Sequence, residues 1–193
     1  PGQGPGEFIS PTDIDFDGTG NIYIADRTQK KITVFTQGGR YKRTIQIPAF
    51  FYYFTLSESG LIYVNTPSDS LISVYDQQGS LIKKFGKRVT HKRTSINTQL
   101  NECELGFDKE GFLWVSYINR PHIRKYNVEQ GKQLCEFIPE SKNIEEKLDK
   151  MEPIPLEGRY LLIRFTNDFL VGNNYLYRAA SKYILKINKE NFS

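Results

Sequence analysis

The sequence predicts an all-β fold made of repeated four-stranded antiparallel units, and two observations lead to this prediction. A glycine turn followed by an apolar strand recurs along the 193 residues. Aromatic residues make up 13% of the chain, with 12 Tyr and 13 Phe, which favours pleated strands. No apolar run approaches the roughly 20 residues that a membrane-spanning helix needs. The length suits one domain with a real core.

The repeat appears when Phe16–Ile24 is aligned with Leu56–Val64 and Phe107–Val115. The three segments read FDGTGNIYI, LSESGLIYV and FDKEGFLWV, and they align without gaps. A fourth, degraded copy lies at Gly172–Tyr177. Sequence self-similarity of this kind is typical of repeat architectures, in which each copy is one structural unit.

Each copy continues through a polar loop into a second strand, a glycine-containing turn and a last strand. The second strands begin at Ile32, Ile72, Ile123 and Ile184. A four-stranded meander of about 40 residues has the size of a propeller blade. We therefore predict a β-propeller domain over residues 1–193, with blades at 8–47, 50–86, 100–138 and 160–190 and insertions at 86–97 and 139–158.

Glycines in the repeat are expected in turns that require positive φ, namely Gly18, Gly20, Gly60 and Gly111. A phosphate-binding loop is not expected, because no helix pattern follows these glycines. In the second insertion, residues 143–150 are predicted to form a short helix. Asn143 can cap it, Glu146 can bond back to the cap, and Pro153 ends the segment.

The first unit, GPGEFISPTDIDFDGTGNIYIADRTQKKITVF, resembles the NHL repeat and the bacterial six-bladed β-propeller proteins of that group. The resemblance implies a ring of six blades, so the chain is expected to be a sector of a longer protein. It also implies an extracytoplasmic location, periplasmic or at the cell surface. Asp26 matches the last Asp of the family's A-D turn and is expected to bond backbone amides.

The resemblance further implies that ligands bind on one rim, where the segments leading into the inner strands meet the loops between the second and third strands. A protein, a peptide, a glycan or another small molecule would suit the mixed charges and tyrosines there. The rim candidates are Asp13, Arg27, Tyr53, Asn65, Glu102, Glu104, Tyr117, Arg120, His122, Arg164 and Arg178.

Three functions stay open, and the first is our main expectation: a non-catalytic binding or scaffold module. The second is a propeller lyase or hydrolase with a channel metal. No metal or other cofactor is predicted, although Asp13 and Glu104 would be the carboxylates for a Ca²⁺ site completed by other oxygens. The third is RNA binding through a basic loop. We expect a solvated loop rather than a nucleic-acid site, because stacking aromatics do not interleave with its charges. The basic loop contains Lys87, Arg88, Lys92 and Arg93.

Two cysteines, Cys103 and Cys135, lie outside any metal-binding spacing. We expect both to pack as small, buried or half-buried thiols. The formal net charge of +4 permits an anionic partner without requiring one.

Overall fold

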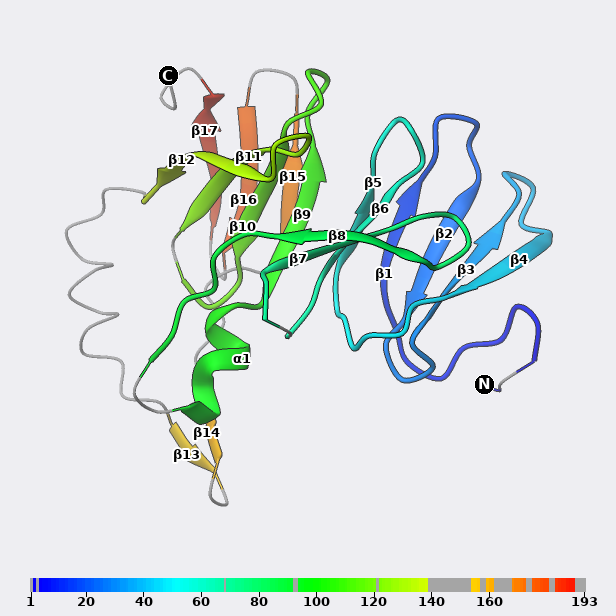
Figure 1. Cartoon of the computed structure of the whole chain (residues 1–193), viewed down its shortest axis with the longest axis horizontal. Coiled ribbons are helices and arrows are strands. Elements are labelled where there is room, and N and C mark those ends of the chain that lie inside the picture. Colours follow the sequence, from blue (N-terminus) through cyan, green and yellow to red (C-terminus); the bar gives the residue numbers. More distant parts are fainter. Residues whose placement is uncertain are drawn as a thin grey trace. The chain divides into compact units, whose positions relative to one another are not determined.

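The computed structural model confirms the all-β prediction, with strands over most of the part that it describes (Figure 1). Described are residues 2, 4–67, 69–91, 94–120, 122–138, 154–156, 159–161, 168–172, 175–180 and 183–189. The chain forms two units, Pro1–Gly86 and Lys87–Ser193. No helix in these described ranges is long and apolar enough to cross a membrane.

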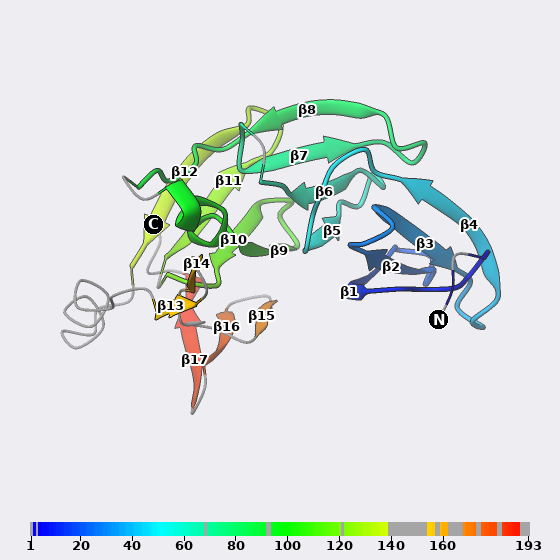
Figure 2. The same cartoon turned by 90° about the horizontal axis from the view of Figure 1, so that it is seen from below.

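The first unit contains two four-stranded antiparallel sheets in simple meander order, which we call blade 1 and blade 2. Figure 2 shows the strands of each blade following one another across the sheet. Blade 1 consists of β1 (Pro11–Phe16), β2 (Ile22–Asp26), β3 (Lys31–Phe35) and β4 (Tyr41–Gln46). Blade 2 consists of β5 (Phe54–Leu56), β6 (Ile62–Asn65), β7 (Ile72–Tyr75) and β8 (Leu81–Phe85).

The core of the first unit lies between blade 1 and blade 2. Alternating residues of each strand point to one face of its sheet, and the apolar ones are buried here. Ile32 and Val34 of β3 and Ile62 and Val64 of β6 have no exposed surface. Burying each such side chain contributes about 1.5–3 kcal/mol, so the face-to-face contact of the two blades holds the unit together.

Carboxylates of blade 1 bind the backbone of blade 2 directly. Asp13 Oδ2 accepts from the Phe54 amide at 2.8 Å. Asp15 Oδ2 accepts from the Leu56 amide at 2.8 Å and from the Thr55 hydroxyl at 3.0 Å. The edge of a sheet leaves backbone N–H groups without a ladder partner. The two aspartates satisfy these groups and fix β1 beside β5.

The repeated turns have the positive φ predicted for three of the four glycines. Gly20, Gly60 and Gly111 have φ values of +81°, +80° and +80°. Gly18 lies in the same turn as Gly20 but is not among the described glycines with positive φ, so that part of the prediction is wrong. The Asp17 carboxylate accepts from the Thr19 and Asn21 amides of this turn, at 2.9 and 3.0 Å.

The second unit contains blade 3, a four-stranded meander like the other two, and shorter pieces of sheet. Blade 3 consists of β9 (Cys103–Phe107), β10 (Leu113–Tyr117), β11 (Ile123–Asn127) and β12 (Lys132–Phe137). A three-stranded sheet contains β15 (Asp168–Val171), β16 (Tyr175–Ala180) and β17 (Tyr183–Asn188). A hairpin joins β13 (Ile154–Leu156) and β14 (Arg159–Leu161).

Blade 3 packs on the three-stranded sheet through Trp114, Ile123, Leu176 and Ile187. Trp114 is fully buried, and its Nε1–H donates to Asp108 Oδ2 at 2.7 Å. The indole nitrogen therefore has the partner that a buried tryptophan needs.

The segment before blade 3 contains a helical turn that the sequence reading missed. It consists of η1 (Thr94–Ile96) and α1 (Asn97–Leu100). Buried Asn101 follows it, accepts from the Val89 amide at 2.8 Å and donates back to the Val89 carbonyl at 2.8 Å. The predicted helix at 143–150 lies outside the described residues.

Candidate functional site

The rim of blade 3 gathers an arginine, a histidine and a tyrosine of the predicted set. β10 ends at Tyr117, and β11 begins at Ile123, so the loop between them places Arg120 and His122 beside the Tyr117 ring. The Arg120 guanidinium carbon lies 5.0 Å from the ring centroid. The His122 ring packs edge-on at a centroid distance of 6.3 Å. A guanidinium over an aromatic face is held in place while its remaining N–H groups can bind an anion.

A second arginine joins this cluster from β11. The guanidinium carbon of Arg124 also lies 5.0 Å from the Tyr117 ring centroid. Its Nε–H donates to Glu136 Oε1 at 3.0 Å, and its Nη1 donates to the Lys87 carbonyl at 2.9 Å. These bonds tie Arg124 to the structure. Arg120 is half-buried at the end of the loop that precedes β11. We call Tyr117, Arg120, His122 and Arg124 the blade 3 rim cluster.

Burial sets the electrostatics of the rim cluster. It raises the pKa of Tyr117 well above its ordinary value, so the phenol stays protonated at any physiological pH. Burial also lowers the pKa of Arg120, but an arginine still stays charged. The cluster therefore presents permanent positive charge in a partly dehydrated position, where an anion is attracted more strongly than in water.

Two predicted acidic residues flank the cluster on β9 and the segment before it. Glu102 Oε2 accepts from Asn119 Nδ2 at 3.4 Å, and the Glu102 carbonyl accepts from the Ile118 amide at 3.0 Å. Glu104 is buried and pairs across the strands with Ser116, so it faces the opposite side of the sheet from Tyr117. The rim is therefore of mixed charge, with the arginines on the Tyr117 side.

The predicted rim residues of the first unit have mainly structural contacts. Asp13 binds the Phe54 amide, and buried Asn65 donates to the Leu71 carbonyl at 3.0 Å. The Arg27 guanidinium carbon lies 5.1 Å from the centroid of the Tyr52 ring. Tyr53 packs against Tyr52 at 6.3 Å between ring centroids. Arg27 and Tyr53 thus share one aromatic neighbour, which is a smaller version of the blade 3 arrangement.

Asp26 has the structural role predicted for it. Its carboxylate accepts from the amides of Ile9, Ser10 and Gln29 at 2.7, 3.2 and 3.0 Å. Burial alone would raise its pKa, but these hydrogen bonds outweigh burial and hold the pKa below its usual value. Asp26 therefore anchors the segment that precedes β1.

The basic loop is described in part. Lys87 contributes its carbonyl to Arg124, and Arg88 Nη2 donates to the Asn97 carbonyl at 3.5 Å. Arg164, Lys92 and Arg93 lie outside the described residues, and Arg178 lies on β16 with its side chain undescribed.

Neither metal ligands nor reactive thiols gather at the described rim. The described residues contain no group of three or more His, Cys, Asp or Glu that could hold a metal ion. Neither Cys103 nor Cys135 forms a disulfide, and Cys103 is buried while Cys135 is half-buried, as predicted. Burial raises the pKa of both thiols, and for Cys103 it does so strongly. A thiol in that state is a poor nucleophile.

Arg124 is the member of the rim cluster that sequence reasoning missed, although the repeat carries a signal for it. Arg124 stands where the first two units have Thr33 and Ser73. A large charged residue at a position that is otherwise a small hydroxyl marks a departure from the repeat. A residue that departs from the repeat at a rim is a candidate for a function that the other blades do not share.

Comparison with known proteins agrees with this architecture. A family described as 6-bladed beta-propeller matches residues 1–150. The chain belongs to this family. No curated protein matches the propeller chain at a significant level.

Three of the similar solved structures come from bacteria. Virginiamycin B lyase from Staphylococcus aureus has a TM-score of 0.57 at 16% identity, covering 94% of this chain and 53% of the lyase. A candidate exported protein from Bacteroides fragilis has a TM-score of 0.61 at 14% identity, covering 100% and 59%. The extracellular domain of a candidate one-component system from B. thetaiotaomicron has a TM-score of 0.55 at 17% identity, covering 95% and 23%.

The propeller chain thus spans 23–59% of the length of these neighbours. At such low identity the likeness shows the fold alone.

Proposed function

We propose that the chain is a non-catalytic binding module of a β-propeller and that the blade 3 rim cluster captures an anionic group of its ligand. The observation that carries the proposal is Arg120 stacked over the buried Tyr117 ring. Stacking orients the guanidinium, and partial burial strengthens its attraction for a carboxylate, sulfate or phosphate. Such a group could belong to a small molecule, an acidic glycan or an acidic peptide.

Titration calorimetry with charged and neutral probes tests this function. We expect D-glucuronate or tri-aspartate to bind at low salt and D-glucose not to bind. Higher salt should weaken the binding, because it screens the charges. If neither anionic probe binds, or if glucose binds equally well, the proposal fails.

Two variants that remove the same charge at different places test where the anionic probe binds. Arg120→Gln should weaken the affinity for the anionic probe about tenfold or more, since a charge-assisted hydrogen bond contributes about 1.5–3 kcal/mol. Arg40→Gln is the control, because Arg40 is exposed in the turn between β3 and β4, at the opposite end of blade 1 from the rim. An equal loss in both variants would mean that net charge, and not the rim cluster, attracts the probe.

A channel-metal lyase or hydrolase and an RNA-binding propeller are the alternatives to this proposal. Titrating Ca²⁺ or Zn²⁺ while following thermal unfolding tests the first, because a bound metal stabilises the folded state. The RNA-binding alternative predicts that single-stranded RNA binds with a steep salt dependence. It also predicts that replacing Lys87 and Arg88 with Ala abolishes this binding.

We also propose that the protein acts outside the cytoplasm. Two of the similar structures support this location, one a candidate exported protein and the other an extracellular domain. Protease treatment of intact cells of the source organism, read with an antibody to this chain, should degrade a surface-exposed protein. Cell fractionation would detect a periplasmic one, and recovery only with the cytoplasm would contradict the proposal.

A further inference from the structure

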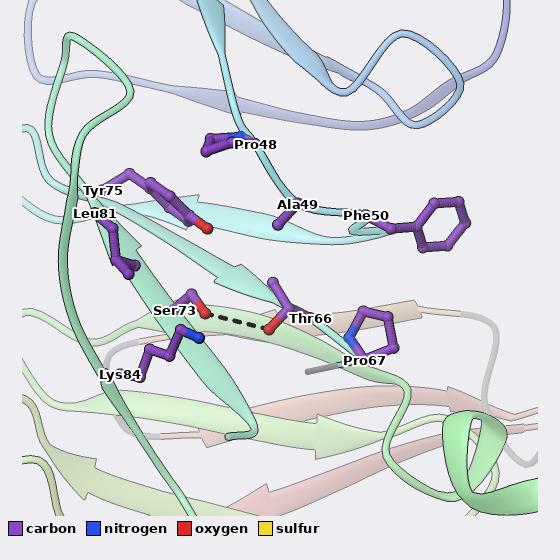
Figure 3. Close-up of a pocket in the computed structure, with 9 residues that line it drawn as sticks. All are labelled: Pro48, Ala49, Phe50, Thr66, Pro67, Ser73, Tyr75, Leu81 and Lys84. Carbon is purple, nitrogen blue, oxygen red and sulfur yellow. Dashed lines mark hydrogen bonds between the residues drawn. The ribbon is translucent and has the colours of Figure 1, made fainter. Parts of the chain in front are cut away.

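Blade 2 contains a pocket of about 410 Å³ that the rim cluster does not involve (Figure 3). It lies against the segment that joins blade 1 to blade 2, with Pro48, Ala49 and Phe50 on one side and β7 and β8 on the other. Pro67, Leu81 and Tyr75 complete its apolar walls, and its polar groups are Thr66, Ser73 and Lys84. A volume of this size suits a small organic ligand.

The sequence repeat explains why blade 2 has a pocket at this place. In the repeat, Thr66 of blade 2 corresponds to Tyr117 of blade 3, and Ser73 corresponds to Arg124. Blade 3 therefore has a large phenol and a guanidinium at the two positions where blade 2 has small hydroxyls. The side chains that occupy this space in blade 3 are missing from blade 2, which leaves room for a ligand.

In blade 1 the corresponding space is covered by the chain itself. Thr33 and Phe35 lie on the same face of β3, and the Phe8 ring packs on Phe35 at a centroid distance of 6.0 Å. Blade 2 has the joining segment Pro48–Phe50 in that place, and the pocket remains beneath it.

The cross-strand partner at this place carries opposite charge in blades 2 and 3. Arg124 pairs across the strands with Glu136, whereas Ser73 pairs with Lys84. Blade 3 thus fills the space with an aromatic ring and a cation bonded to an acid at 3.0 Å. In blade 2, Lys84 stands at the position of that acid. A complementary ligand would therefore have an aromatic ring to fill the space of the missing Tyr117 ring and an anion to meet Lys84.

Polar groups in the pocket fit a carboxylate. The Thr66 and Ser73 hydroxyls lie 3.2 Å apart, side by side on the floor. Burial raises the pKa of Tyr75, which therefore keeps its phenolic proton at neutral pH. Lys84 lies 3.0 Å from Asp69, but the Asp69 side chain is 74% exposed. Exposed ion pairs contribute little, so the ammonium group can turn to a buried anion at small cost.

We infer that the blade 2 pocket binds a small aromatic carboxylate, with the ring between the proline and leucine walls and the carboxylate on Lys84 and the Thr66–Ser73 hydroxyls. The site lies in the first unit and is independent of the proposed rim function in blade 3.

The test is NMR titration of the whole chain with 3-phenylpropionate, with 3-phenylpropan-1-ol and with acetate. We expect 3-phenylpropionate to shift backbone signals around residues 48–50 and 66–84 in a saturable manner. The alcohol lacks the charge and acetate lacks the ring, so each should bind about tenfold more weakly or not at all. Equal binding of the alcohol would overturn the carboxylate assignment. Absence of saturable shifts at these residues would overturn the site.

Matched variants separate the pocket from general charge effects. Lys84→Gln should weaken 3-phenylpropionate about tenfold. Lys83→Gln removes the same charge from the opposite face of β8, where Lys83 pairs with Val74, and should leave the affinity unchanged. Equal losses in the two variants, or none in Lys84→Gln, would refute the proposal.

Importing the blade 3 side chains gives a second, independent check. The variant Thr66→Tyr with Ser73→Arg and Lys84→Glu should fill the pocket and abolish binding. Retained binding in a folded triple variant would contradict the inference. Because Lys84→Gln changes only a partly exposed side chain, the proposal stays testable even if the triple variant fails to fold.

Discussion

Two glycines of one turn should respond oppositely to the same substitution. Gly20 has φ +81°, and a Cβ added there would contact only the Gln37 side chain, at an ordinary 3.5 Å. The cost of Gly20→Ala therefore comes from the backbone and should be about 1–2 kcal/mol. Gly18 has no atom within 4 Å of an added Cβ and is not among the positive-φ glycines. Gly18→Ala should stabilise by about 0.4–1 kcal/mol, because it restricts the unfolded chain.

Urea unfolding followed by far-ultraviolet circular dichroism measures both variants against the unsubstituted chain. The predicted separation of roughly 1.5–3 kcal/mol exceeds the error of such an experiment. The two positions share the same Asp17-centred turn, so a loss of the turn would affect both alike. If Gly18→Ala costs as much as Gly20→Ala, the assignment of strain to φ is wrong.

Three further predictions concern single residues. Gly111→Val should lower the free energy of unfolding by about 2–3 kcal/mol through φ strain alone, since φ is +80° and no atom lies within 4 Å of an added Cβ. Urea unfolding followed by the fluorescence of Trp114, the one tryptophan, measures this, and an unchanged unfolding curve would contradict it. Gly106→Ala should destabilise the contact of β9 with β15, because the added Cβ would lie 2.7 Å from Val171 Cγ2; a neutral result would mean that β15 can shift freely. The folded-state pKa of Asp26 is below its usual 3.8, so the carboxylate stabilises the fold above about pH 4, and this stabilisation is lost as pH falls through the folded pKa. In urea unfolding between pH 5 and 3, Asp26→Asn should therefore reduce the loss of stability on acidification. An unchanged pH slope would exclude the Asp26 carboxylate as the source of that loss.

The candidate site was predictable only in part, because the repeat places loops but not side chains. Arg120 and His122 could be assigned to a rim from the position of the loop between the second and third strands. Their convergence on Tyr117 depends on ring and guanidinium geometry, which a linear sequence does not specify. Asp13 shows the opposite case, since its position suggested a ligand while its carboxylate binds the Phe54 amide of the next blade.

The first insertion contains a feature that the sequence did not predict. The turn at Thr94–Leu100 has no helical periodicity, and its stability comes from the bonds between Asn101 and the Val89 backbone. These hydrogen bonds join residues that lie 12 positions apart in the sequence. Local propensity therefore carries no signal for them.

The sequence by itself determined the strand repeat, the blade as the unit of structure and the positive φ of Gly20, Gly60 and Gly111, because these depend on alternation and on local backbone sterics. Only the tertiary structure decided at which of the equivalent positions in the blades a pocket or a side-chain cluster forms. Whether Thr66 and Ser73 leave a pocket, or Tyr117 and Arg124 fill one, depends on how a joining segment lies over the sheet and on side-chain volume in three dimensions.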